Sequence, residues 1–197
     1  MVALAVSNRI IPALSTFPTA GGWAHVSAIT LMTTAAAGVV STATGFVDPV
    51  RDFRSPSSIL RMCSAFLFPS LAEETVWRAA LLPHPSTSPV SLYHAGIVLA
   101  AHVASHPIAG RTVWPRGRDV FDDPRFLVIA TIVLGGATAS YIMSGGSVWA
   151  AAFTHGVPVA LWRDCFGGED ALMKRSSSSS TDNAPIPKDK QSFGADD

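Results

Sequence analysis

Two adjacent carboxylates and a guanidinium lie inside an otherwise apolar stretch of this 197-residue chain. Glu73, Glu74 and Arg78 fall within Leu71–Leu82, and the two glutamates are the only acidic residues between positions 55 and 118. Charged groups in apolar surroundings cost on the order of several kcal/mol unless they are paired. A cost of this size indicates that the three side chains serve a function.

The spacing of these residues predicts their geometry on a helix. Glu74 and Arg78 are four positions apart and share one face, whereas Glu73 points roughly 100° away. The second carboxylate therefore pairs with the arginine, and the first is left to act as a general base toward water. A purely structural role is an alternative for the same residues. Ser70-Leu-Ala-Glu73 after Pro69 also matches a capping box, with Glu74 and Arg78 as a plain ion pair.

Three of the six histidines could join this site. His102 and His106 are four positions apart and share a helix face, and His155 lies in a later apolar segment. A single buried histidine is more often a hydrogen-bonded core residue than a catalyst or ligand, but three histidines beside a buried glutamate pair favour a site. With Glu73 they could also hold a divalent metal such as zinc, although HxxxH alone is a weak motif. The remaining histidines lie near span ends or in a turn, where water is close: His25, His84 and His94.

The composition indicates the protein class that must position these residues. Hydrophobic residues make up 48% of the chain and charged residues only 14%, which is too apolar for a typical soluble domain of this size. The formal net charge is zero, so the sequence predicts no nucleic-acid partner. Cys63 and Cys165 lack ligand-like spacing. We therefore expect an all-α, polytopic membrane helical bundle.

The apolar segments predict about five transmembrane helices. A stretch of about 20 apolar residues crosses roughly 30 Å of hydrocarbon. Small residues at positions 135, 136, 139 and 140 are suited to close helix packing in lipid. The predicted spans are Trp23–Val47, Ile59–Leu82 with an interruption at Pro69, Val90–His106 ended by Pro107, Arg125–Met143, and Val148–Trp162, with a polar loop at 108–124.

The chain divides into three parts on this basis. Residues 1–22 form an N-terminal segment, either a targeting sequence or a disordered one, with Arg9 as its only charge. Residues 23–170 form the membrane domain. Residues 171–197 contain a run of serines, prolines and mixed charges, a composition typical of a disordered tail.

The basic residues predict the orientation of five alternating spans. The loops after the first and third spans and the C-terminal segment would share one side, and Arg9 alone lies on the other. This asymmetry follows the positive-inside rule and predicts a tail on the cytosolic or equivalent organellar side. The basic residues of that side are Arg51, Arg54, Arg61, Arg111, Arg116, Arg118, Arg125, Arg163, Lys174, Arg175, Lys188 and Lys190.

The motifs resemble those of the CAAX prenyl protease and bacteriocin-processing (CPBP, or Abi) family of intramembrane endopeptidases. Glu73-Glu74-Thr-Val-Trp-Arg78 matches its EExxxR motif, and His102-Val-Ala-Ser-His106 matches FxxxH with histidine in place of phenylalanine. His155 matches the histidine of the third motif. The resemblance covers about residues 58–168, which defines a family-like core.

This resemblance implies a role for each matched residue. Glu73 would activate water, Glu74 and Arg78 would hold the geometry, His106 would position the water, and His155 would stabilise the oxyanion. The third motif usually continues to Asn or Asp four residues later, where this chain has Val159. Loss of one such donor typically costs on the order of 100- to 1000-fold in rate.

His106 and His102 are expected to differ in role. His106 stands at the family's histidine, and Pro107 after it biases His106 out of the helix, leaving its ring near open carbonyls. His102 stands at the family's phenylalanine, a position enclosed by neighbours. We therefore expect His102 to be a neutral supporting residue with one ring nitrogen bonded inside the bundle.

The sequence thus predicts a multi-pass intramembrane endopeptidase that hydrolyses a peptide bond near the membrane with a glutamate-activated water. Its partners would be the lipid bilayer and a protein or peptide substrate, with or without a prenyl group, in a membrane that could be organellar. No cofactor is expected, and a divalent metal bound by Glu73, His102, His106 and His155 stays an open alternative. A catalytically weak or inactive scaffold protein is the second hypothesis, and a haem-binding bundle is a third, which would leave the glutamates unexplained.

Overall fold

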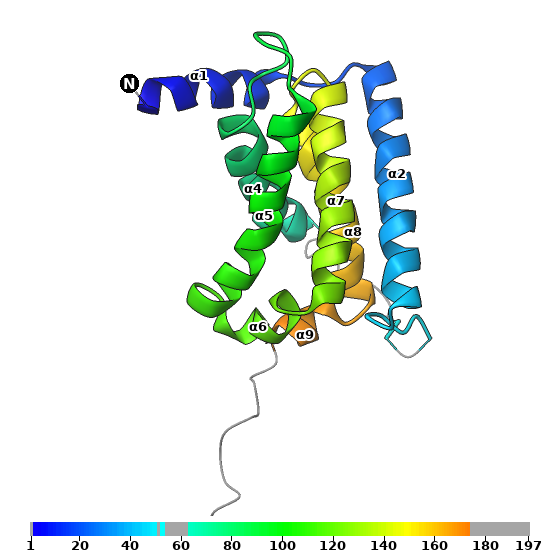
Figure 1. Cartoon of the computed structure of the whole chain (residues 1–197). Coiled ribbons are helices and arrows are strands. Elements are labelled where there is room, and N and C mark those ends of the chain that lie inside the picture. The colour runs from blue at the N-terminus through cyan, green and yellow to red at the C-terminus, as the bar shows by residue number, and fades with distance from the viewer. Residues whose placement is uncertain (1, 51, 54–62, 174–197) are drawn as a thin grey trace, which may run out of the picture.

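The computed structural model describes residues 2–50, 52–53 and 63–173, and every regular element in these ranges is helical. Four long helices stand side by side in a bundle, α1 lies across one end, and α6 and α9 lie at the other end (Figure 1). The long helices are α2 (Ala20–Ala43), α5 (Leu92–Thr112), α7 (Pro124–Met143) and α8 (Val148–Cys165). The end helices are α1 (Val2–Ser15), α6 (Arg118–Phe121) and α9 (Gly168–Met173), and η3 (Pro115–Gly117) precedes α6.

A broken helix carries the two glutamates. It consists of η1 (Phe66–Leu71), α4 (Ala72–Glu74) and η2 (Thr75–Ala80). Phe68 leaves the helical region at φ −142° and ψ 122°, directly before Pro69, so the predicted interruption at Pro69 is confirmed. The Ser70 hydroxyl donates to the Ala65 carbonyl at 3.0 Å and caps no helix, so the capping-box alternative is wrong.

The N-terminal segment was expected to be either a targeting sequence or disordered, and its described part is helical rather than disordered. Val2–Ser15 forms α1, and Ala13 is fully buried in the core. Arg9 donates to the Ala80 and Leu81 carbonyls at 3.4 and 3.3 Å, and the Trp149 indole donates to the Leu14 carbonyl at 2.8 Å. Buried apolar side chains and these bonds across helices supply the free energy that orders the segment.

Small and hydroxylated residues allow α2, α7 and α8 to pack closely. A Cβ atom added at Gly136 would clash with the Thr33 hydroxyl, so only glycine permits this approach. The Thr154 hydroxyl lies 2.9 Å from that of Thr30 and 2.7 Å from that of Ser140, which links the three helices through a buried polar cluster. Gly136 and Ser140 thus pack as predicted from the small-residue face.

Two described helices, α2 and α7, are long and apolar enough to cross a membrane. The expected all-helical architecture is therefore confirmed for the described residues. The expected number of five transmembrane helices is not confirmed. The shortfall has a physical reason, because α5 and α8 carry the site histidines and the glutamate helix is broken. The start of the second predicted span, residues 59–62, the basic residues Arg51, Arg54 and Arg61, and the tail after Met173 lie outside the described residues.

Helix α5 is longer than expected, because Pro107 lies inside it and does not end it. A proline at this position removes the amide that would bond the Val103 carbonyl. The Nδ1 atom of His106 lies 3.3 Å from that carbonyl and 3.2 Å from the His102 carbonyl. The imidazole thus supplies the missing donor, and the helix continues to Thr112. The predicted polar loop at 108–124 is accordingly mostly helical.

His84 also departs from expectation. It is 3% exposed in the turn after η2, where its Nδ1 lies 2.7 Å from the Ser86 hydroxyl and its Nε2 3.3 Å from the Thr16 hydroxyl. Burial lowers the pKa of His84 below its ordinary value. The residue is a structural contact between α1 and the turn rather than a water-exposed side chain.

Candidate active site

Arg78 is a fully buried cation on η2 that contacts α4, α5 and α7. Its Nη1 donates to Glu74 Oε1 at 3.2 Å, and its Nε lies 3.1 Å from Glu74 Oε2. On α7, the Thr138 hydroxyl accepts from Nε and Nη2 at 3.3 and 3.1 Å, and the Leu134 carbonyl accepts from Nη2 at 2.7 Å. The predicted Glu74–Arg78 pair is therefore present, and α7 fixes the plane of the guanidinium.

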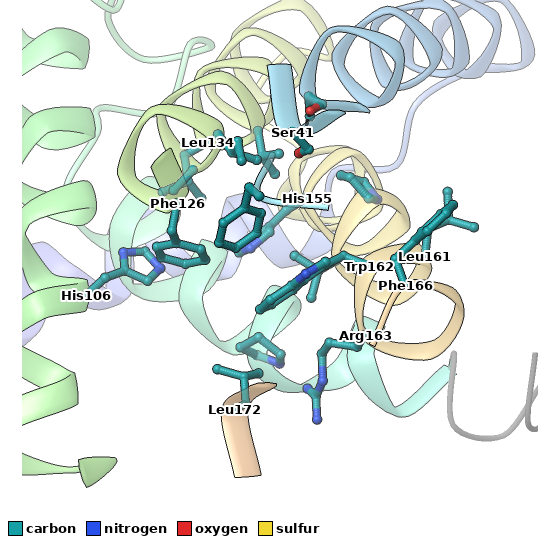
Figure 2. Close-up of a pocket in the computed structure, with 18 of the residues that line it drawn as sticks. Ser41, His106, Phe126, Leu134, His155, Leu161, Trp162, Arg163, Phe166 and Leu172 are labelled. Carbon is teal, nitrogen blue, oxygen red and sulfur yellow. Dashed lines mark hydrogen bonds between the residues drawn. The ribbon is translucent and has the colours of Figure 1, made fainter. Parts of the chain in front are cut away.

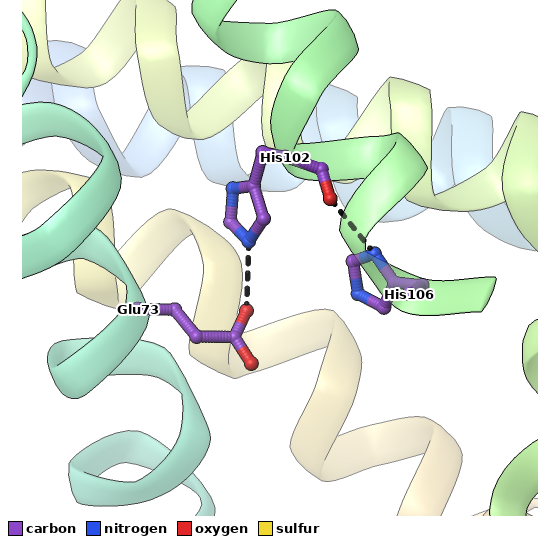
Figure 3. A group of neighbouring side chains, drawn as sticks. All are labelled: Glu73, His102 and His106. Atoms are coloured by element: carbon purple, nitrogen blue, oxygen red, sulfur yellow. Dashed lines mark hydrogen bonds and ion pairs between the residues drawn. The ribbon is translucent and has the colours of Figure 1, made fainter. Parts of the chain in front are cut away.

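The remaining contact of Arg78 defines the tautomer of His102. Arg78 Nη1 donates to His102 Nδ1. An arginine side chain can only donate, so this ring nitrogen must be the acceptor and a neutral His102 carries its proton on Nε2. Nε2 in turn donates to Glu73 Oε2 at 2.9 Å (Figure 3).

The His102 ring contacts two other rings. It stacks on Trp77 with ring centroids 4.7 Å apart and planes inclined by 11°, and on His106 at 5.6 Å and 16°. The sequence predicted a buried supporting histidine, and burial is observed at 1% exposure. Both ring nitrogens are engaged rather than one. His102 could not be an axial haem ligand in this arrangement.

Glu73 reaches the edge of a cavity with one oxygen engaged. Its side chain is 31% exposed, and Oε2 accepts from His102. Among the residues described, none donates to Oε1. Glu73 was expected to be unpaired, but His102 holds it by one hydrogen bond. Its second oxygen is available to a molecule in the cavity.

His106 is oriented by its own helix. Since Nδ1 lies against two backbone carbonyls, it carries the proton, and Nε2 of the neutral ring presents a lone pair. The ring packs edge-on against Phe121 and Phe126 at 5.7 and 5.3 Å. Figure 2 shows His106 beside Phe126 on the cavity wall. The structure therefore presents an acceptor nitrogen near Glu73.

Glu74 and His155 form a second pair behind the cavity. His155 Nδ1 donates to Glu74 Oε1 at 2.9 Å, and both side chains are buried. This bond directs the opposite edge of the imidazole away from Glu74. His155 also lines the cavity (Figure 2), so one face of the site is a histidine that is oriented by a carboxylate.

The cavity itself measures about 560 Å³ and is bordered by α2, α5, α7 and α8. Its polar groups include Glu73, His106 and His155, and most of its wall is apolar or aromatic. Val159 also lines it, so the side chain that replaces the expected Asn or Asp adds no hydrogen-bond donor there. A cavity of this size and lining accommodates an apolar ligand with a few polar contacts.

All six predicted residues, including His102, lie in or directly behind this site. Sequence reasoning missed Thr138, the Leu134 carbonyl and Trp77, which hold Arg78 and His102 from neighbouring elements. A threonine in an apolar span carried the only signal for Thr138, since such hydroxyls often bond across helices in membranes.

Comparison with known families identifies the chain. Residues 55–160, more than half of the chain, match the family described as type II CAAX prenyl endopeptidase Rce1-like. The chain belongs to this family. Membership makes it a membrane protein of the CAAX protease class that acts on peptide substrates. No curated protein and no solved structure matches the chain.

Part of this candidate site has the residue types of a metal site. Ligand atoms of Glu73, His102 and His106 lie within 4.8 Å of one another. The donor set does not fit a metal as it stands, because His102 Nε2 holds a proton while Arg78 occupies Nδ1. Coordination by His102 would require loss of that proton or of the arginine contact.

Proposed function

We propose that this Rce1-like chain is an intramembrane endopeptidase in which Glu73 activates the water that attacks the peptide bond. The observation that carries the proposal is the joint position of Glu73 Oε1 and the His106 Nε2 lone pair at the cavity. Two acceptors that face one water molecule bind both of its protons and leave its lone pair available for attack.

The proposed reaction uses no covalent intermediate with the enzyme. Glu73 takes one proton from water as the oxygen attacks the scissile carbonyl carbon, which gives a tetrahedral oxyanion. The protonated Glu73 then gives that proton to the leaving amine as the carbon–nitrogen bond breaks. The products are an amine and a carboxylic acid, which releases its remaining proton to water and becomes a carboxylate. Glu73 returns to its starting state.

His155 is proposed to stabilise the oxyanion through Nε2. Its Nδ1 already donates to Glu74, so a second proton on Nε2 is needed, and the Glu74 carboxylate compensates the resulting imidazolium charge. Arg78 keeps Glu74 in place on its other side. The buried pair thus has the same orienting role that an aspartate has toward a catalytic histidine in a triad.

The proposed orientation in the membrane places the α6 and α9 end on the cytosolic or equivalent side. Arg111, Arg116, Arg118 and Arg163 lie at this end, whereas Arg9 lies on α1 at the opposite end (Figure 1). Val113, Trp114 and Leu172, from the same end, contribute to the cavity wall. A substrate anchored in the membrane could therefore enter from that side.

The function is tested by comparing the proteomes of cells that contain the wild-type protein or Glu73→Gln. We expect protein termini close to membrane segments that appear with the wild type and are missing with the variant. A variant at a glutamine of the C-terminal segment, Gln191→Glu, controls for expression and handling. Identical sets of termini from the wild type and Glu73→Gln would refute the proposal.

A metal-independent reaction is proposed because His102 Nε2 holds its proton. Activity should then survive dialysis against a strong chelator. Loss of activity in the chelator, with recovery on addition of zinc, would replace the glutamate mechanism by a metal-dependent one.

One observation favours a second function, that of a weak or inactive relative that binds a membrane partner. Val159 lines the cavity where the resembled family usually carries an Asn or Asp donor. If this missing donor limits the rate, Val159→Asn should raise cleavage. Capture of the same membrane partner by wild type and Glu73→Gln, without cleavage by either, would support the binding function.

A further inference from the structure

Four side chains from different elements form one hydrogen-bonded chain that ends at the proposed base. Thr138 on α7 accepts from Arg78 on η2, Arg78 donates to His102 on α5, and His102 donates to Glu73 on α4. Each of the three links joins residues that are distant in sequence. The Glu73 carboxylate is therefore oriented by the packing of three separate elements.

The direction of every link follows from the chemistry of the groups. Arg78 has no acceptor, so both Thr138 and His102 Nδ1 must accept from it. The Thr138 hydroxyl gives its own proton to the Leu134 carbonyl at 2.8 Å, which leaves its lone pairs for the guanidinium. The neutral His102 ring is then left with one proton, on Nε2, and that proton points at Glu73 Oε2.

We propose that His102 is a positioning residue of this enzyme: Arg78 fixes its tautomer, and His102 in turn holds Glu73 Oε2 so that Oε1 faces the cavity. The inference rests on the proposed role of Glu73 as the base. It gives His102 a task that differs from metal binding, because Nε2 is a donor toward the carboxylate and has no lone pair to offer a metal.

The stacking of the ring adds a second constraint. Trp77 and His106 stack on the His102 ring in nearly parallel planes. Stacking fixes the plane of the ring, and the bonds to Arg78 and Glu73 select one of the two flipped orientations that share this plane. A single orientation is therefore favoured, which is what a residue that acts through another side chain requires.

Substitutions of His102 distinguish the effect of its hydrogen bonds from that of its ring volume. His102→Phe preserves a planar ring but removes both bonds, so kcat should fall about 10- to 100-fold, as is typical on loss of a supporting partner, with little change in KM. His102→Gln offers an oxygen to Arg78 and an amide proton to Glu73 and should recover most of kcat. His94→Phe, the same exchange two turns earlier on α5, controls for a general effect on the helix.

These variants are assayed as full chains in detergent micelles with a prenylated CAAX peptide as the probe. Wild-type kcat in His102→Phe would overturn the inference, as would an equal loss in His102→Phe and His102→Gln. Greater activity of the glutamine variant than of the phenylalanine variant would support it.

A second measurement is independent of activity. Nitrogen chemical shifts of ¹⁵N-histidine-labelled wild-type protein, assigned by the signal missing from His102→Gln, report which ring nitrogen is protonated. We expect a neutral His102 with its proton on Nε2. A proton on Nδ1 would overturn the inference even if the enzyme is active, whereas the expected tautomer in a protein that cleaves nothing would refute only the proposed function.

Discussion

Arg78 illustrates how one residue can be both a stability determinant and a site component. Its removal in Arg78→Ala leaves the buried Glu74 carboxylate with His155 as its remaining partner, and it also frees Thr138 and His102. Breaking a buried pair on one side costs roughly 3 to 5 kcal/mol. We therefore expect a lower yield of folded protein and a lower melting temperature in detergent.

The matched control for this substitution is Arg116→Ala, because Arg116 is exposed beside α6. Its melting temperature should stay near that of the wild type. Normal folding of Arg78→Ala would show that the Glu74–Arg78 pair contributes little free energy.

Contacts between residues close in sequence could be predicted from their spacing. Glu74 and Arg78 are four positions apart, so their pairing follows from helix geometry alone. The contact of His102 with Glu73 and that of Thr138 with Arg78 join different helices. Such contacts depend on how the helices pack, and periodicity in one segment carries no information about them.

At the scale of the element, Pro107 gives α5 an unusual link to the site. Its missing amide leaves the Val103 carbonyl to His106 Nδ1. Pro107→Ala restores a backbone donor that competes for this carbonyl, so we expect a more stable helix together with a lower kcat, since the His106 ring is held less firmly. Melting temperature and kcat measured on the same preparation check both effects, and an unchanged kcat would argue against the orienting role.

The start of α7 provides a test of stability outside the membrane-spanning segments. Asp123 is the N-cap residue and accepts from the Arg125 amide at 2.8 Å. Loss of such a cap costs about 1 kcal/mol, so Asp123→Ala should melt at a lower temperature at neutral pH. Asp123→Asn, which keeps a capping oxygen but no charge, should be affected less.

The stabilisation that Asp123 provides should decrease at acid pH. Hydrogen bonds from Arg125 hold the pKa of Asp123 below its ordinary value of 3.8. Its stabilising contribution is therefore complete above that ordinary value and declines as the pH falls through the lower pKa of the folded protein. The melting-temperature difference between wild type and Asp123→Ala should narrow in that acid range, and a constant difference down to the lowest pH would contradict the cause given.

Helix boundaries could be predicted where an apolar run is bounded by residues that begin or end helices. The helix at Pro124–Met143 begins one residue before its predicted start and ends where predicted, because Asp123-Pro124 begins it and a glycine turn follows it. The α5 helix was predicted too short, since its proline is compensated by a side chain that the general rule does not consider. The α1 helix was missed because its order depends on contacts with distant residues.

At the scale of the whole molecule, the unequal distribution of basic residues predicts how the protein sits in the membrane. We expect the tail after Lys174, which lies outside the described residues, to be accessible on the same side as α6 and α9. In sealed vesicles with the cytosolic face outward, an external protease should remove the tail without loss of activity. Protection of the tail would indicate the opposite orientation in the membrane. Lost activity would show that the tail is required.

The class and all-helical character of the molecule could be predicted because composition and apolar run length determine them. The number of spans could not, since a polar site inside a bundle lowers the hydropathy of the very helices that build it, as α5 and α8 show. The cavity could not be predicted either. It is lined by residues of α2, α5, α7 and α8 together with Glu73 on α4, so it depends on how these elements pack.

The proposed role of Glu73 as the base of a membrane protease is tested by the kcat of purified Glu73→Gln on a prenylated CAAX peptide, with the wild type measured in parallel. The amide fills the same space but cannot take a proton, so we expect a protein with wild-type melting behaviour and no detectable cleavage. Cleavage by folded Glu73→Gln at a rate near that of the wild type would contradict it.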